Sequence, residues 1–139
     1  MMKLEILPSL LAADFGRLAD EIRRAEASGA EALHLDVMDA HFVPNLSFGP
    51  DVVALAKRVA PGFYRNVHLM MSRPDLYLEK FAAAGAQTLQ VHVEADRVHH
   101  VQVQRLRAGG LRPPDLVGKP PEVGGQKRWQ YLKFHHRSL

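Results

Sequence analysis

The sequence predicts an α/β protein of about four parallel β/α units, followed by an irregular basic tail. In the first 95 residues, short segments with the period-2 alternation of strands follow longer segments with helical spacing, and glycine or proline separates them. In addition, the segment ASGAEALHLD (27–36) is similar in sequence to AAGAQTLQVH (83–92), which lies 56 residues later. Each copy combines a helix end, a glycine and a strand. Strands that alternate with helices in this way form parallel sheets.

The expected helices have recognisable starts and stops. Asp14 is typical of an N-cap before the first helix, residues 49–51 (Gly-Pro-Asp) open the second, and Pro74 lies at the start of the third. Gly29 and Gly85 suit the position that follows the end of a helix. The four expected strands are residues 4–8, 32–38, 63–70 and 88–93.

Length and composition predict one ordinary globular domain. The chain has 139 residues, of which 47% are hydrophobic and 24% are charged. It contains no apolar run of the roughly 18 residues that a membrane span needs, and its first residues make a poor secretory signal, so we expect no membrane association. The chain contains no cysteine, which excludes disulfides and thiolate metal sites and fits a cytoplasmic location.

The net charge changes sign along the chain. Residues 1–95 contain 9 Lys/Arg and 12 Asp/Glu, whereas residues 96–139 contain 9 Lys/Arg and 3 Asp/Glu. We therefore predict two parts: residues 1–95 with the β/α units, and an atypical basic tail over 96–139, in which 105–113 is the end of a possible fourth helix. A basic tail is compatible with nucleic acid, but no nucleic-acid module is recognisable, and we do not expect such a partner.

The segment LHLDVMDAHFVPN (33–45) carries an unusual set of side chains for a strand. His34, Asp36 and Met38 share one face, because side chains alternate with a period of two. On the next strand His68 and Met70 share a face in the same way. Adjacent parallel strands lie about 4.8 Å apart, so side chains at matching heights can converge on one ion or substrate.

Two imidazoles and a carboxylate suit one divalent cation such as zinc, iron, manganese or cobalt. Such an ion could polarise a carbonyl and stabilise an enediolate, and thioethers nearby would be inert as acids or bases. For each histidine alone a structural role is more common, but placement on neighbouring strands favours the metal site. Ser9 either binds a substrate hydroxyl or caps a turn, and Asp39 is either functional or turn-forming. His92 and Glu94 could surround the ligands or form a solvated pair.

Four segments together resemble the ribulose-phosphate 3-epimerase family: LPSLLAADF (7–15), LHLDVMDAHFVPNLSFG (33–49), VHLM (67–70) and VHVEA (91–95). The resemblance covers about residues 3–95. It implies that these residues form the N-terminal half of a (β/α)8 TIM barrel of the ribulose-phosphate-binding type, where the units alone would also allow an open sheet.

The resemblance also implies an activity: metal-dependent interconversion of D-ribulose 5-phosphate and D-xylulose 5-phosphate at C3, through an enediolate. By matching motif, His34, Asp36 and His68 would ligate the metal and Asp36 would be one of two acid/base carboxylates. Ser9, His68, Met38 and Met70 would bind the phosphorylated ketopentose.

The chain departs from the family pattern at several places. Ala40 stands where the family usually has glycine, which would cost on the order of 1 kcal/mol if the position needs a positive φ. Asn66 stands where aspartate is common. After residue 95, neither the second catalytic aspartate nor the glycine-rich phosphate loops are recognisable, which suggests a frameshift, a truncation or a genuinely different domain.

Two further interpretations remain open at the level of sequence. A hexulose-phosphate 3-epimerase would use a nearly identical first half. Alternatively, the chain is a non-catalytic half-barrel that associates with a partner or with copies of itself, because unpaired sheet edges favour association.

Overall fold

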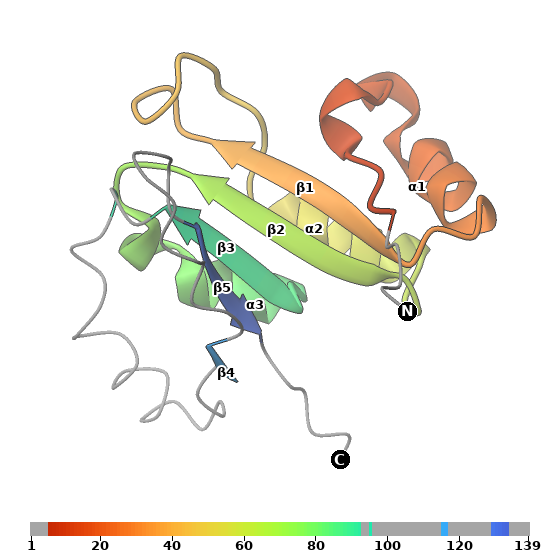
Figure 1. Ribbon diagram of the computed structural model, residues 1–139. Helices are drawn as coiled ribbons and strands as arrows, with labels where there is room; N and C mark the ends of the chain where they lie inside the picture. Colours follow the sequence, from red (N-terminus) through yellow and green to blue (C-terminus); the bar gives the residue numbers. More distant parts are fainter. Residues whose placement is uncertain (1–5, 93–94, 96–114, 117–128, 134–139) are drawn as a thin grey trace.

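The computed structural model describes residues 6–92, 95, 115–116 and 129–133. Its centre is a five-stranded sheet with the strand order β1-β2-β3-β5-β4 (Figure 1). Three strands, β1 (Ala32–Met38), β2 (Tyr64–Met70) and β3 (Thr88–His92), run parallel to one another. They match the expected strands to within a residue at each end, which confirms the period-2 prediction for this part of the chain.

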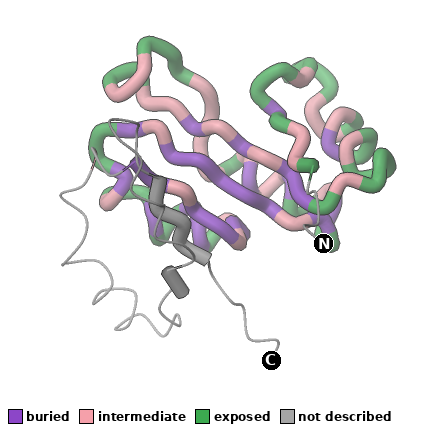
Figure 2. The backbone as a smooth tube through the Cα atoms, in the orientation of Figure 1, coloured by how far each residue is buried: buried purple, intermediate pink, exposed green. Residues whose placement is uncertain are grey.

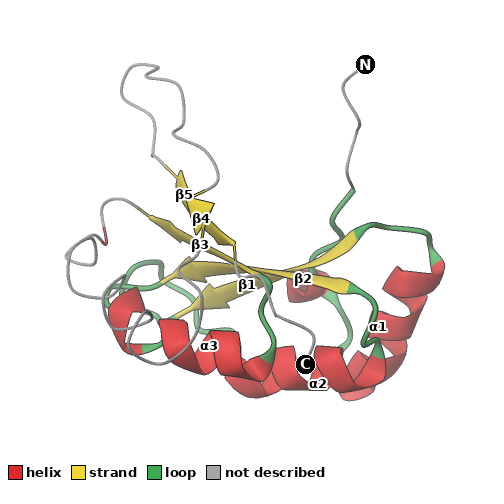
Figure 3. Ribbon diagram, turned by 90° about the horizontal axis from the view of Figure 1, so that it is seen from below, coloured by secondary structure: helices red, strands yellow, loops and turns green. Residues whose placement is uncertain are grey.

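Three α-helices cover one face of the parallel strands (Figure 3). They are α1 (Leu18–Ala27), α2 (Pro50–Val59) and α3 (Leu78–Ala84), and α2 packs against both of the others. Short 3-10 turns at Leu10–Ala12, Phe15–Arg17 and Pro74–Leu76 lead into α1 and α3.

Two predicted helix starts are therefore corrected. The Asp14 carboxylate accepts from the Gly16 N–H and caps the Phe15–Arg17 turn rather than α1 itself. Pro74 likewise begins a 3-10 turn, and α3 starts only at Leu78. The extra turns move each helix start along the chain and leave the buried helix faces as expected.

The core lies between the helices and the sheet. The inward residues of β1 and β2, namely Leu33, Leu35, Val67 and Leu69, are fully buried (Figure 2). They pack with Ile22, Val53, Ala56, Leu78, Phe81 and Leu89. Apart from Arg65, the polar residues of the same strands consequently face the other way, toward the side of the sheet where the described residues form no helix.

The first predicted strand is not formed as such in the described residues. Residues 6–8 have no strand assignment, and Ser9 makes only an isolated parallel bridge with His34. The His34 N–H donates to the Pro8 carbonyl at 2.9 Å. The segment therefore runs alongside β1 in the expected direction, but the described part of it makes one bridge instead of a ladder.

The tail differs from its prediction. Within the stretch expected to be irregular, β5 (Trp129–Lys133) pairs antiparallel with β3, and β4 (Asp115–Leu116) pairs antiparallel with β5. The possible fourth helix over 105–113 lies outside the described residues. None of the helices in the described part of the chain combines the length and the apolar character that a membrane crossing needs.

Within the described ranges, two glycines and one alanine adopt a left-handed backbone. Gly29 (φ 79°) and Gly85 (φ 109°) follow α1 and α3, as predicted. Ala40, two residues after the end of β1, has φ 61°. This region favours glycine, because a Cβ atom there crowds the following carbonyl oxygen.

Replacing Ala40 with glycine is expected to stabilise the fold. The left-handed region costs a non-glycine residue about 1–2 kcal/mol, and the greater freedom of glycine in the unfolded chain offsets about 0.4–1 kcal/mol of this. Urea unfolding should therefore show a net gain of about 0.5–1 kcal/mol. The matched control is Ala54→Gly within α2, which should lose about 1 kcal/mol. Equal losses in both variants would contradict this account of Ala40.

Candidate functional site

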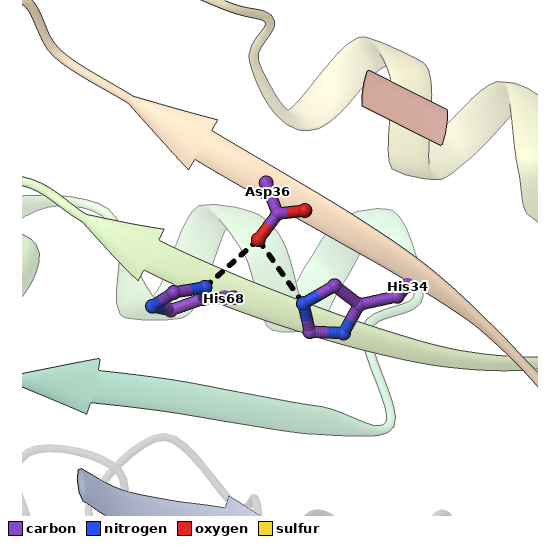
Figure 4. Close-up of side chains that lie close together, drawn as sticks. All are labelled: His34, Asp36 and His68. Carbon is purple, nitrogen blue, oxygen red and sulfur yellow. Dashed lines mark hydrogen bonds and ion pairs between the residues drawn. The ribbon is translucent and has the colours of Figure 1, made fainter. Parts of the chain in front are cut away.

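The candidate site lies where β1 and β2 run side by side, on the face of the sheet opposite α1, α2 and α3. The register places Asp36 opposite His68 and Met38 opposite Met70. His34, two residues before Asp36, projects from the same face. Figure 4 shows that the side chains of His34, Asp36 and His68 converge on one point.

A single carboxylate oxygen is the centre of this cluster. Asp36 Oδ1 lies 3.1 Å from His34 Nε2 and 2.8 Å from His68 Nδ1. The second oxygen, Oδ2, accepts from the Ser9 hydroxyl at 2.7 Å. One ligand atom from each of His34, Asp36 and His68 can be chosen so that all lie within 4.8 Å of one another. This spacing and donor set could hold a metal ion.

The electrostatics of the cluster favour an ionised carboxylate. Burial raises the pKa of Asp36, but the hydrogen bonds with His34, His68 and Ser9 outweigh it and hold the pKa far below its usual range. The hydrogen bond with Asp36 in turn raises the pKa of His34, against the opposing effect of burial. A negative charge at a fixed point between two imidazole nitrogens attracts a proton or a metal cation.

Each imidazole also has a partner on its other nitrogen. His34 Nδ1 lies 3.1 Å from Asn66 Oδ1, and His68 Nε2 lies 3.0 Å from His92 Nε2. Both partners are buried, with exposed fractions of 8% for Asn66 and 4% for His92. Two residues were expected around the proposed ligands, His92 and Glu94. His92 contacts His68, and the His92 ring also packs against Phe42. Glu94 lies outside the described residues.

Ser9 caps a turn, which is one of the two roles expected for it, and it also contacts Asp36. Its side chain accepts from the Leu11 N–H and caps the Leu10–Ala12 turn, and its hydroxyl donates to Asp36. The isolated bridge between Ser9 and His34 holds this turn at the edge of β1. A hydroxyl in this position can orient the carboxylate.

The loop after β1 hydrogen-bonds to the end of that strand through Ser47, which the sequence analysis did not identify as a functional residue. Ser47 Oγ donates to the Asp36 carbonyl at 2.8 Å and accepts from the Met38 N–H at 3.0 Å. Asn45 Nδ2 lies 3.3 Å from Met38 Sδ. A serine in a polar loop carries no signal of such a contact, because the contact exists only once the loop folds back on the strand.

Asp39 is a turn-forming residue in the structure. Its carboxylate accepts from the backbone N–H groups of His41, Phe42 and Ser72 at 2.8–2.9 Å. Burial raises the pKa of Asp39, but these backbone hydrogen bonds outweigh it and lower the pKa to about 2. Asp39 thus ties the loop after β1 to the loop after β2.

The stabilisation by Asp39 is expected to depend on pH. Because the folded pKa of about 2 lies below the ordinary value of 3.8, the stabilisation is fully present above pH 4 and is lost as the pH falls toward 2. Asp39→Asn should lower the free energy of unfolding by about 1–2 kcal/mol at pH 6, and by less at pH 3. Urea unfolding at both values measures this, with the exposed Glu26→Gln as control. A difference that stays constant with pH would contradict it.

Comparison with known proteins identifies the family of this chain. The model of the "Ribulose-phosphate 3 epimerase family" matches residues 5–127, so the match continues past residue 95 into the basic part of the chain. A ribulose-phosphate 3-epimerase of Rhodobacter capsulatus is 48% identical over 122 residues, which are 86% of this chain and 53% of that protein. The Bacillus subtilis enzyme of the same name is 43% identical over 109 residues, 78% of this chain and 50% of that protein.

A third relative is a cytoplasmic isoform of ribulose-phosphate 3-epimerase from Oryza sativa, 40% identical over 110 residues. This match covers 78% of the chain and 48% of the rice protein. The chain thus spans about half the length of the curated relatives it matches. It belongs to the ribulose-phosphate 3-epimerase family, whose fold is the (β/α)8 barrel, and its parallel strands and covering helices form part of such a barrel.

Proposed function

We propose that the chain supplies the metal-holding part of a ribulose-phosphate 3-epimerase site, which interconverts D-ribulose 5-phosphate and D-xylulose 5-phosphate through an enediolate. The observation that carries the proposal is the single oxygen of Asp36 that lies within 3.1 Å of one nitrogen of each of two imidazoles. Membership of the family supports the substrate and the reaction.

The residues that would hold one divalent cation (zinc, iron, manganese or cobalt) are His34, Asp36 and His68. When bound, the cation would supply polarisation of the substrate carbonyl and its neighbouring hydroxyl, which lowers the energy of the enediolate. The set of two imidazole nitrogens and one carboxylate oxygen fits these borderline metals better than it fits magnesium or calcium, which prefer oxygen ligands alone.

The remaining roles belong to side chains of the chain itself. Asp36 would accept the C3 proton and return it on one face of the enediolate. Ser9, whose hydroxyl already donates to Asp36, would orient this carboxylate and bind a substrate hydroxyl. His68 would contact the substrate oxygens, and Met38 and Met70, side by side in the register, would line the planar intermediate with groups that do not exchange protons.

Inversion at C3 needs a second acid/base group on the opposite face of the enediolate. The sequence offers no recognisable candidate after residue 95, so we propose that this group and the phosphate site come from chain that corresponds to the other half of the relatives, or from a partner copy in an oligomer. The division of this chain at residue 95 and a cytoplasmic location remain predictions from the sequence.

Exchange of the substrate's C3 proton with solvent distinguishes a site with one acid/base group from a site with two. The chain is incubated with Co²⁺ or Zn²⁺ and D-xylulose 5-phosphate in D₂O, and NMR follows both the C3 proton and the appearance of D-ribulose 5-phosphate. Metal-dependent deuterium uptake at C3 without inversion is expected if Asp36 acts alone on one face. Uptake with inversion would show a complete site, and faster uptake with a hex-2-ulose 6-phosphate would favour the hexulose alternative.

A folded chain that binds the metal and shows no exchange with either sugar would contradict the catalytic proposal. It would favour the non-catalytic half-barrel, which sedimentation would then test through self-association.

A further inference from the structure

The side chain of His34 contacts a residue of the neighbouring strand through its Nδ1 atom. Asn66 on β2 is the register partner of His34 on β1. Its carbonyl oxygen Oδ1 lies 3.1 Å from His34 Nδ1. Only 8% of Asn66 is exposed, so water cannot readily replace this contact.

The partners of both ring nitrogens decide which nitrogen of His34 carries the proton. Asn66 Oδ1 only accepts hydrogen bonds, so the contact with it needs the proton on Nδ1. Asp36 Oδ1, 3.1 Å from Nε2, also only accepts, so the two oxygens compete for the single proton of a neutral ring. Because Asp36 also lies 2.8 Å from His68 Nδ1 and accepts from Ser9 at 2.7 Å, we expect the proton to stay on Nδ1 and the lone pair of Nε2 to face the same point as Asp36 Oδ1.

The second imidazole has a partner of a different kind. His68 Nε2 lies 3.0 Å from His92 Nε2, and an imidazole nitrogen can be either donor or acceptor. The imidazole of His92 can therefore accept from His68 or donate to it, whereas the amide oxygen of Asn66 can only accept from His34.

We propose that Asn66 is a positioning residue that fixes His34 in the tautomer with the proton on Nδ1, so that Nε2 is presented to a metal ion before the ion arrives. The role in metal binding rests on the proposed function. The tautomer does not, because it follows from the hydrogen-bond partners of His34 and Asp36 in the metal-free chain. Partners of this type commonly change metal affinity by about 10–100-fold.

Zn²⁺ affinity, measured by competition with a chromophoric chelator, tests the role in binding. Asn66→Leu removes the acceptor and should weaken binding by about 10–100-fold. Asn66→Asp keeps an oxygen acceptor of the same shape and should bind Zn²⁺ at least as tightly as the natural chain. The matched control is Thr88→Val, which removes a buried hydroxyl from the register partner of Asn66 on β3 and does not touch His34 in the structure. Its affinity should be unchanged.

Long-range ¹H–¹⁵N NMR on the metal-free chain at pH 8.5 tests the tautomer itself, with His34→Gln used to assign the signal. The natural chain should show the His34 proton on Nδ1. In Asn66→Leu the proton should move to Nε2, where it can be donated to Asp36. A purely structural role of Asn66 would change the unfolding midpoint without moving this proton.

The possible failures are distinguishable. If the natural chain binds Zn²⁺ no better than Asp36→Asn, the metal site is wrong, while the tautomer measurement still decides the role of Asn66. If His34 carries its proton on Nε2 in the natural chain, or if Asn66→Leu folds and binds Zn²⁺ with unchanged affinity, the inference about Asn66 is overturned. If Asn66→Leu does not fold, a loss of affinity in Asn66→Asp overturns it.

Discussion

Replacing Asp36 with asparagine is expected to weaken Zn²⁺ or Co²⁺ binding by at least about 100-fold, more than the loss of an outer partner would, and to abolish C3 proton exchange. The substitution keeps the shape of the side chain and removes its charge. In the natural chain, one oxygen of Asp36 lies within 3.1 Å of both imidazoles, so the charge that attracts the cation and the base that would take the proton are the same group. Calorimetry with Zn²⁺ and exchange in D₂O measure the two losses separately.

Asp39→Asn is the matched control, because it removes a carboxylate at the end of the same strand. Asp39 binds three backbone N–H groups and belongs to the loops, so its loss should lower stability without changing metal affinity. An Asp36→Asn chain that still binds the metal tightly would remove Asp36 from the ligand set. Equal losses of affinity in both variants would indicate a nonspecific effect of net charge.

Replacing Arg65 with methionine is expected to lower the free energy of unfolding by about 3 kcal/mol or more. Arg65 is 5% exposed and lies on the helix side of β2. Its guanidinium donates to the carbonyls of Phe63 at 2.6 Å, Gly85 at 2.8 Å and Pro61 at 3.3 Å. Methionine keeps most of the volume but leaves these carbonyls without their donor, which costs about 1–3 kcal/mol for each buried group.

Urea unfolding of Arg65→Met and of the exposed control Arg58→Met measures this effect. Arg65→Lys should fall between them, because an ammonium group keeps the charge but cannot reach several carbonyls with one planar fork. Zn²⁺ affinity should change little in the folded Arg65 variants, since the guanidinium and the proposed metal ligands lie on opposite faces of the sheet. An unfolding free energy for Arg65→Met equal to that of Arg58→Met would contradict this role.

The sequence by itself determined the parallel strands, the helices and the face on which the proposed metal ligands lie. His34, Asp36 and His68 were found because side-chain alternation is a local property of an extended chain. The family resemblance raised a positive φ at residue 40 only as a condition, and the structure meets it, with φ 61° at Ala40. Residues 6–8 of the expected first strand have no strand assignment, because pairing depends on neighbouring strands rather than on the apolar pattern of the segment itself.

Only the tertiary structure decided which side chains meet. The register of β1 on β2 places Asp36 opposite His68 and Asn66 opposite His34, and no local pattern specifies a register between strands 30 residues apart. The fold of the loops brings Ser9 and Ser47 to β1 and turns Asp39 toward backbone amides. Arg65 occupies a position where alternation predicts an apolar residue, because the ends of two neighbouring helices present carbonyls there. Hydrogen bonds between distant segments form only after packing has brought those segments together. The sequence pattern within each segment therefore does not predict them.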